Sequence, residues 1–331
     1  PHFQHRLFLT ATPHNGYTES FTSLLELLDD QRFARNILPD EKQLSQVMIR
    51  RLKSDLVDAA GQPLYAQRKL QALAVPYTAE EREIHQKLND YCASREKDAE
   101  KTGSTFGTSF VNQLLKKRLF SSPAAFASTL EKHVASLSNG AKPKGRDAMA
   151  ERILRKAILK ADEDYANDQE VENAQSEAVE EASRRSQPLT QEQQRILADL
   201  RQWAQRAKNQ TDSKARAILD WLSANLKPGG QWNDRRVILF TEYRTTHQWM
   251  HEILASHGFG GERLGLLHGG LTQDEREPIK AAFQASPKDS PVRILLATDA
   301  ASEGIDLQNH CNCLIHLEIP YNPNVMEQRN G

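Results

Sequence analysis

The sequence has few cysteines and no long apolar run, and each shortage excludes a class of protein. Only Cys92, Cys311 and Cys313 occur among 331 residues. Such a small, odd number excludes a disulfide framework, and the single Cys-x-Cys pair lacks the second pair that a tetrahedral zinc site needs. No apolar run approaches the roughly 18 residues of a membrane-spanning helix. We therefore expect a reduced, cytoplasmic protein with no membrane partner.

An excess of charge of one sign is also lacking. Charged residues make up 26% of the sequence and sum to a net charge of -1, so any binding of nucleic acid must use a local patch. The mean hydropathy of -0.66 indicates long helices with wide solvated faces. The length predicts about two domains.

The last third of the chain alternates between apolar runs and helical patterns. The apolar runs are VILFT, RLGLLH, RILLATD and CLIHLEI, at residues 237–241, 263–268, 293–299 and 313–319. Helical patterns separate the first three runs. This alternation predicts an α/β fold, a doubly wound parallel sheet with helices on both faces.

The first two thirds are mainly helical. Apolar runs predict strands at Leu7–Ala11 and at residues 70–78, but between about residue 95 and residue 227 the strand pattern is absent. Thr78 and Glu81 have the spacing of a capping box, which predicts that a helix begins there. The Pro228-Gly229-Gly230 sequence then predicts a break between domains.

One segment of the helical region is strongly acidic. Residues 162–183 contain nine acidic side chains and no basic one. A block of this kind is typical of a solvated helix or of a linker.

Two stretches place polar groups just after predicted strands, where open α/β sheets bind ligands. The sequence LTATP ends the first predicted strand with Thr10 and Thr12. The sequence LLATDAASEGIDLQ, at 295–308, brings Thr298 to a strand end and then presents Gly304 and Asp306. A hydroxyl with nearby backbone amides suits a phosphate, and a carboxylate can accept hydrogen bonds from ribose hydroxyls.

Together with four other stretches, these two resemble the motifs of the Swi/Snf-type superfamily 2 helicase-like ATPases. The motifs occur in the order of the family, from motif III through motifs IV, IVa and V to the opening of motif VI, with an Arg-Arg-x-Lys-x-Asp segment after motif III. The matching stretches are LTATPHNG, IRRLKSDL, VILFTEY, LHGGLTQDERE, ATDAASEGIDLQ and PYNPNVMEQRNG. The first and last are most similar to bacterial members, such as the RNA-polymerase-associated ATPase and the DISARM phage-defence ATPases.

The resemblance implies a domain order and an activity. Residues 1–75 would be the tail of a first RecA-like lobe, residues 76–230 a helical insertion with an acidic linker at 162–183, and residues 231–331 a second RecA-like lobe. The whole protein would couple ATP hydrolysis to movement on double-stranded DNA, with ATP and Mg²⁺ as its cofactors. RNA polymerase or a defence-system component would be its protein partner.

The resemblance also implies roles for individual residues. Thr10 and Thr12 would couple the nucleotide state to lobe closure, and Gly304 and Asp306 would face ATP. Gln328 and Arg329 would open the catalytic segment whose arginines stabilise the transferring phosphoryl group. Contacts to the nucleic-acid backbone would come from His14, Asn15, Thr298, Gln273 and Arg276.

Several of these residues have a structural alternative. Arg50 and Arg51 can serve in ion pairs as well as in binding DNA or nucleotide. Arg276, which is flanked by acidic residues, can also be a solvated side chain, and Asp306 can cap a turn.

Two motifs of the family are missing. The sequence contains no G-x-x-x-x-G-K-[ST] loop and no Asp-Glu-x-His motif at a strand end, and these hold the phosphates and Mg²⁺. We therefore expect a piece of a longer ATPase that neither turns over ATP nor binds ATP and Mg²⁺ tightly by itself. Two alternatives stay open: a non-catalytic interaction module with one RecA-like lobe, and an RNA helicase.

Overall fold

The structure is a computed structural model that describes residues 5–10, 13–14, 18–102, 104–138, 152, 154–158, 168–299, 309–320 and 323–330. The chain divides into two compact units. One comprises Pro1–Leu73 with Tyr321–Glu327, and the other comprises Ala74–Pro320 with Gln328–Gly331.

The first unit is small and contains short helices. Its elements are α1 (Thr18–Leu28), α2 (Glu41–Val47) and the 3-10 turn η1 (Lys53–Asp55). Phe21 and Leu25 on the inner face of α1 pack with Phe33. Asp40 begins α2 with a capping box to Gln43. Helix α13 (Pro323–Asn330) begins in this unit and ends in the other.

Two strands were predicted outside the sheet, and both predictions are wrong where the structure describes these residues. Residues 7–10 and 70–78 have no regular secondary structure. A strand needs a neighbour for its backbone hydrogen bonds, and neither segment pairs with a strand among the described residues. Leu7, Leu9 and Leu70 are consequently left exposed.

Long helices make up the first part of the second unit. They are α3 (Ala79–Thr102), α4 (Thr105–Ser121), α5 (Pro123–Ser138), α7 (Asp168–Arg184) and α8 (Gln191–Ala207). The predicted capping box is present, since Glu81 accepts a hydrogen bond from the Thr78 amide at 2.7 Å and the Glu81 amide donates to the Thr78 hydroxyl. The inner faces share one apolar core, which includes Leu88, Leu115, Phe126 and Leu200.

The acidic segment is a packed helix over its described part. Residues 168–183 form most of α7 rather than a linker, and residues 162–167 lie outside the described residues. Ala174, Ala178 and Ala182 recur at helical spacing and are buried against the bundle. The prediction of a linker is therefore wrong over residues 168–183, where a helix forms and small apolar residues along one face of α7 pack against the bundle.

The predicted parallel sheet is confirmed. Its strands are β1 (Val237–Thr241), β2 (Leu264–Leu267), β3 (Ile294–Thr298) and β4 (Leu314–His316), in the spatial order β2-β3-β1-β4. All described pairings are parallel, and Val237 lies opposite Ile294 while Ile238 lies opposite Leu314. The central strands β1 and β3 are buried along their whole length, as continuous apolar runs predict.

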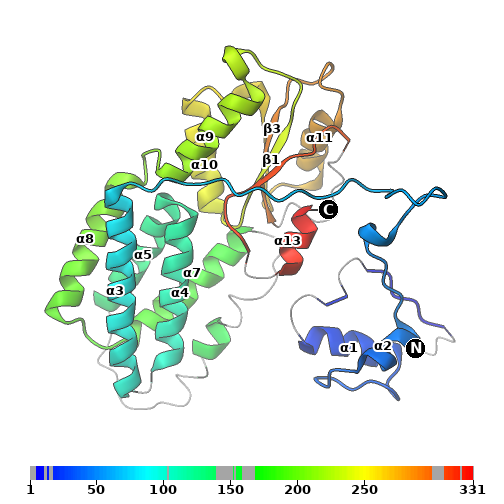
Figure 1. The fold of residues 1–331 in the computed structure, drawn as a ribbon. Helices are drawn as coiled ribbons and strands as arrows, with labels where there is room; N and C mark the ends of the chain where they lie inside the picture. Colours follow the sequence, from blue (N-terminus) through cyan, green and yellow to red (C-terminus); the bar gives the residue numbers. More distant parts are fainter. Residues whose placement is uncertain are drawn as a thin grey trace. The chain divides into compact units, whose positions relative to one another are not determined.

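Helices cover both faces of this sheet (Figure 1). Val237 and Leu239 pack on one face with α9 (Ser213–Leu226) and α10 (Arg244–Ser256). Ile238 and Phe240 point to the other face, where Phe283 of α11 (Gln273–Gln284) covers them. This alternation of burial along β1 is the period-two pattern of a strand between two layers.

Helix α9 shares the core of the sheet although it precedes the Pro228-Gly229-Gly230 sequence. Those three residues form the 3-10 turn η2, in which Gly229 and Gly230 have φ values of 63° and 82°. A second 3-10 turn, η3 (Gly261–Arg263), leads into β2. The domain boundaries expected near residues 75 and 230 stay predictions.

Candidate nucleic-acid interface

The candidate site lies at the carboxyl edge of the sheet. Because the strands are parallel, they all end at the same edge, which is where open α/β sheets bind ligands. The strand ends bring together Thr241, the His268–Gly269 turn, Thr298 and Glu318.

Thr298 and Gly269 form a receptor for one oxygen atom. The Thr298 hydroxyl donates to Oδ2 of Asp168 at 2.6 Å, and the Gly269 amide donates to the same oxygen at 2.7 Å. Thr298 is fully buried and Asp168 is 4% exposed. Two donors that converge on one anionic oxygen in a buried position make a strong, charge-assisted site.

Arg276 holds the turn that carries the Gly269 amide. Its Nε donates to the Leu271 carbonyl at 3.0 Å and its Nη2 to the Gly269 carbonyl at 2.9 Å. The alternative that Arg276 is only a solvated side chain is therefore wrong. Burial, followed by the charges of Arg244 and Arg276, lowers the pKa of His268, although Asp168 opposes this change. The charged groups that act on His268 are thus of both signs, since Glu275 also opposes the change.

A second carboxylate of α7 contacts the same edge one helical turn further on. The Glu172 carboxylate accepts hydrogen bonds from the Thr245 amide at 3.0 Å and the Thr245 hydroxyl at 2.9 Å, in the first turn of α10. It also pairs with Arg118 at 3.1 Å, and the Arg118 guanidinium lies 3.8 Å from the centre of the Tyr243 ring. Residues four apart share a helix face, so Asp168 and Glu172 contact the sheet domain together.

Arg329 joins the end of the chain to the end of β3. Its Nη2 donates to Oδ2 of Asp299 at 2.8 Å, and its Nε donates to the other carboxylate oxygen. Its Nη1 donates to the Glu318 carbonyl at 2.9 Å. The side chain is fully buried and also lies over the Phe240 ring. A bidentate pair of this kind fixes the guanidinium in one orientation.

Asp299 and Glu318 complete the acidic part of the edge. Burial raises the pKa of Asp299 to about 6, although Arg329 opposes this effect. Glu318 accepts hydrogen bonds from the Thr241 hydroxyl at 3.0 Å and the Glu242 amide at 3.1 Å. The arrangement therefore combines donors aimed at an oxyanion with carboxylates held by the protein's own hydrogen bonds.

The other predicted site residues come from several parts of the chain. Gln273 is exposed in the first turn of α11. Thr10, His14, Arg50 and Arg51 belong to the other unit, where the His14 ring packs against Phe21. Neither Arg50 nor Arg51 makes an ion pair with any described residue. The residues outside the described part of the chain are Thr12, Asn15, Gly304 and Asp306, and so is the side chain of Gln328.

Sequence reasoning missed Asp168, Glu172 and Gly269 as site residues. Asp168 and Glu172 stand in the acidic block, and no local pattern links them to strand ends about a hundred residues later. Their spacing of four on a helix with buried alanines was the one available signal.

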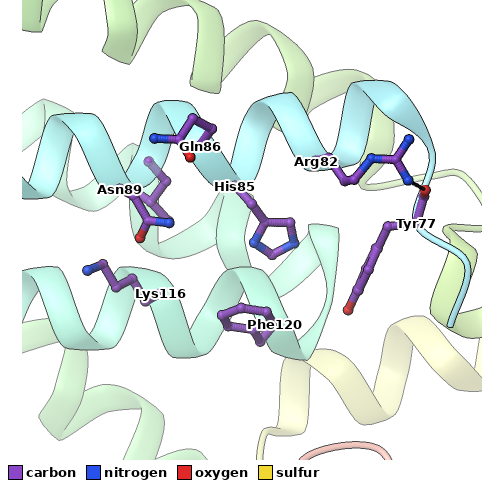
Figure 2. Close-up of a pocket in the computed structure, with 8 residues that line it drawn as sticks. Tyr77, Arg82, His85, Gln86, Asn89, Lys116 and Phe120 are labelled. Atoms are coloured by element: carbon purple, nitrogen blue, oxygen red, sulfur yellow. Dashed lines mark hydrogen bonds between the residues drawn. The ribbon is translucent and has the colours of Figure 1, made fainter. Parts of the chain in front are cut away.

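A separate hollow lies in the helical region (Figure 2). Its volume is about 260 Å³, and residues of α3 and α4 form most of its wall. The ring of His85 lies 4.6 Å from that of Phe120 and 5.4 Å from that of Tyr77. Arg82 donates to the Tyr77 carbonyl at the end of this row, and Lys116 lies at the other end. Aromatic and basic groups thus line this hollow.

In the part of the chain that the structure describes, no group of three or more His, Cys, Asp or Glu side chains is placed to hold a metal ion. Among the described helices, none combines the length and apolar character that crossing a membrane requires. Cys92, Cys311 and Cys313 are free thiols.

The region that contains the parallel sheet is similar to a known protein family. Residues 214–331 match the model described as the helicase conserved C-terminal domain. This range begins at α9 and contains the whole sheet. This part of the chain is therefore a RecA-like helicase C-terminal domain.

Individual relatives carry helicase or related names. An uncharacterized ATP-dependent helicase, YqhH of Bacillus subtilis, is 35% identical over 98 residues, which are 30% of this chain and 16% of that protein. The probable ATP-dependent RNA helicase MJ0669 of Methanocaldococcus jannaschii is 41% identical over 71 residues, 22% of this chain and 18% of that protein. The RNA polymerase-associated protein RapA of Yersinia enterocolitica is 28% identical over 120 residues, 36% of this chain and 11% of that protein. The matched regions span less than a fifth of each relative.

Proposed function

We propose that the chain is the backbone-gripping part of an ATP-dependent motor of the Swi/Snf type that moves on double-stranded DNA. The observation that carries this proposal is the convergence of the Gly269 amide and the Thr298 hydroxyl on one oxygen atom. A phosphodiester oxygen has the charge and the acceptor geometry of the carboxylate oxygen now held there. Phosphate contacts fix the register of a protein on a duplex without reading its sequence.

Other residues of this chain carry the remaining roles in the motor. Arg276 holds the gripping turn, and Gln273 lies exposed beside it for a further backbone contact. Arg329 and Gln328 open the segment that stabilises phosphoryl charge, while Gly304 and Asp306 face the nucleotide. Thr10, Thr12, His14 and Asn15 serve coupling and DNA contact in the other lobe. ATP and Mg²⁺ are held by the longer protein, because the phosphate loop is absent here.

The name of one relative favours a second candidate substrate. The Methanocaldococcus protein is called a probable RNA helicase, so RNA is the alternative to duplex DNA. Of the two protein partners expected, RNA polymerase and a defence-system component, the name of the RNA polymerase-associated relative favours the first.

Salt-dependent binding of labelled duplex DNA and labelled RNA tests the proposal. We expect affinity to fall with salt along a log-log line that is steeper for duplex DNA than for RNA. Because the Thr298 hydroxyl also holds Asp168, the comparison is made in an Asp168→Ala background, where Thr298→Val removes one neutral donor and should weaken DNA binding about fivefold with the same salt slope.

Thr211→Val is the matched control, because Thr211 precedes α9 and lies outside the candidate site. Equal affinities of the Thr298→Val and Thr211→Val variants would contradict a role of the receptor in gripping the backbone. A steeper dependence of log affinity on log salt concentration for RNA than for duplex DNA would favour RNA as the substrate.

A further inference from the structure

Asp168 is an anion from one part of the chain held in a receptor built by another. The receptor groups, Thr298 and the Gly269 amide, belong to the helicase C-terminal domain, whereas Asp168 begins α7 of the helical region. A nearly buried carboxylate of this kind is stable only with partners that satisfy its charge. Here two hydrogen bonds to one oxygen do so.

We propose that the first turn of α7 is an intramolecular competitor for the nucleic-acid backbone, with the Asp168 carboxylate in the position of a phosphate oxygen. This proposal rests on the function proposed above. The backbone reaches the Gly269 amide and the Thr298 hydroxyl only after Asp168 has left them, because each group has one hydrogen to donate. The contact is therefore autoinhibitory, and the ligand that relieves it is a phosphodiester.

The opening required is small. Asp168 is the first residue of α7, and terminal helical turns open more easily than interior ones. The anchor of the rest of the helix lies further along, where Ala178 and Ala182 pack in the bundle and Glu172 is bonded to Thr245 and Arg118. Asp168 can thus release its partners while Glu172 keeps α7 attached to α10.

The first test compares the binding of a short fluorescent duplex by Asp168→Ala and Glu170→Ala. Both changes remove one negative charge from the first turn of α7, but Glu170 is exposed and Asp168 is buried. We expect the Asp168→Ala variant to bind about tenfold more tightly than the unmodified chain. The Glu170→Ala variant should stay within about twofold, which is the size of a general charge effect at an exposed site.

A double variant locates the gain at the receptor. In Asp168→Ala combined with Thr298→Val, the gain should be largely lost, since the group that Asp168 releases is no longer able to donate. Equal gains in affinity in Asp168→Ala and Glu170→Ala would overturn the proposal, because the loss of one negative charge would then explain both gains. Thermal melting of each variant confirms that it is folded at the temperature of the titration.

Hydrogen exchange at the Gly269 amide tests the competitor without nucleic acid. This amide should be protected in the unmodified chain and exchange about tenfold faster in Asp168→Ala. Inorganic phosphate, compared with chloride at equal ionic strength, should restore the protection in the variant. Absence of any phosphate effect would overturn the anion-receptor assignment. Protection by phosphate without any duplex binding would instead contradict the proposed function and retain the receptor.

Discussion

His133 is a buried residue whose protonation the fold opposes. Its Nε2 is hydrogen-bonded to the Tyr91 hydroxyl at 2.7 Å and its Nδ1 to the Ser183 hydroxyl at 2.6 Å, between α5, α3 and α7. Burial, followed by the charge of Arg95, lowers the pKa of His133 to about 3. The unfolded chain, with an ordinary histidine pKa near 6.5, therefore binds the proton more readily than the folded chain.

The sign of the pH dependence follows from this difference. The stability that His133 contributes is fully present above about pH 6.5 and is lost as the pH falls toward about 3. The expected slope from this residue is at most about 1.4 kcal/mol per pH unit. Urea unfolding at several pH values between these limits should show a shallower loss for the His133→Gln variant than for the unmodified chain.

A direct comparison with the variant is needed because other groups titrate in the same range. His247, whose pKa burial lowers to about 3, acts in the same direction. Asp299, with its raised pKa, acts in the opposite direction. Identical slopes for the variant and the unmodified chain would mean that His133 does not stay neutral in the folded state.

At the scale of elements, the start of α3 is tied to the start of α9 by one carboxylate. Glu81 accepts hydrogen bonds from the Ser213 amide at 2.9 Å and from the Thr78 amide and hydroxyl. Burial works to raise the pKa of Glu81, but these hydrogen bonds outweigh it and lower the pKa overall. The charged form is thus the stabilising one.

Replacing Glu81 should therefore destabilise two helix starts at once. We expect Glu81→Gln to lower the free energy of unfolding by about 1–3 kcal/mol, the range for losing hydrogen bonds to a charged, partly buried group. Glu83→Gln on the same helix is the control, because the Glu83 pair with Lys87 is exposed and contributes little. Chemical denaturation at neutral pH measures both, and equal losses would contradict the assigned role of Glu81.

The elements differ in how far the sequence predicts them. The four sheet strands were predicted to within three residues, because a run such as VILFT is apolar on both faces only when two layers cover it. Leu7–Ala11 and residues 70–78 carry a similar apolar signal, yet form no strand where described, since pairing depends on a neighbour. Thr298 and Arg276 were predicted from their motifs, whereas Asp168 enters the candidate site through a contact across 130 positions that no local pattern contains.

At the scale of the whole molecule, the helical region and the sheet domain belong to one compact unit, Ala74–Pro320. Lys214 of α9 is central to this union. Its buried ammonium donates to the Phe120 carbonyl at 2.7 Å, to the Ser121 carbonyl, and to the Leu317 carbonyl at 3.4 Å. It thereby connects the end of α4 with the segment after β4, and burial lowers its pKa.

Removing this ammonium should loosen the helical region from the sheet domain. In Lys214→Met, the side chain keeps its length but leaves the carbonyls at the end of α4 without their charged donor, which costs about 1–3 kcal/mol. Hydrogen exchange should then be at least about fivefold faster at the α4–α5 junction, with β3 little changed. Lys97→Met, at an exposed position of α3, is the control and should leave both regions as they are.

The pattern of exchange then decides how the unit is held together. Ser121 and Ser122 are also hydrogen-bonded to Thr246, and Glu172 to Thr245, so the α4–α5 junction and α7 contact the first turn of α10 independently of Lys214. If α4 and β3 lost protection equally in Lys214→Met, those contacts would suffice to keep the two regions opening together. Loss confined to α4 would show that Lys214 couples the opening of the helical region to that of the sheet domain.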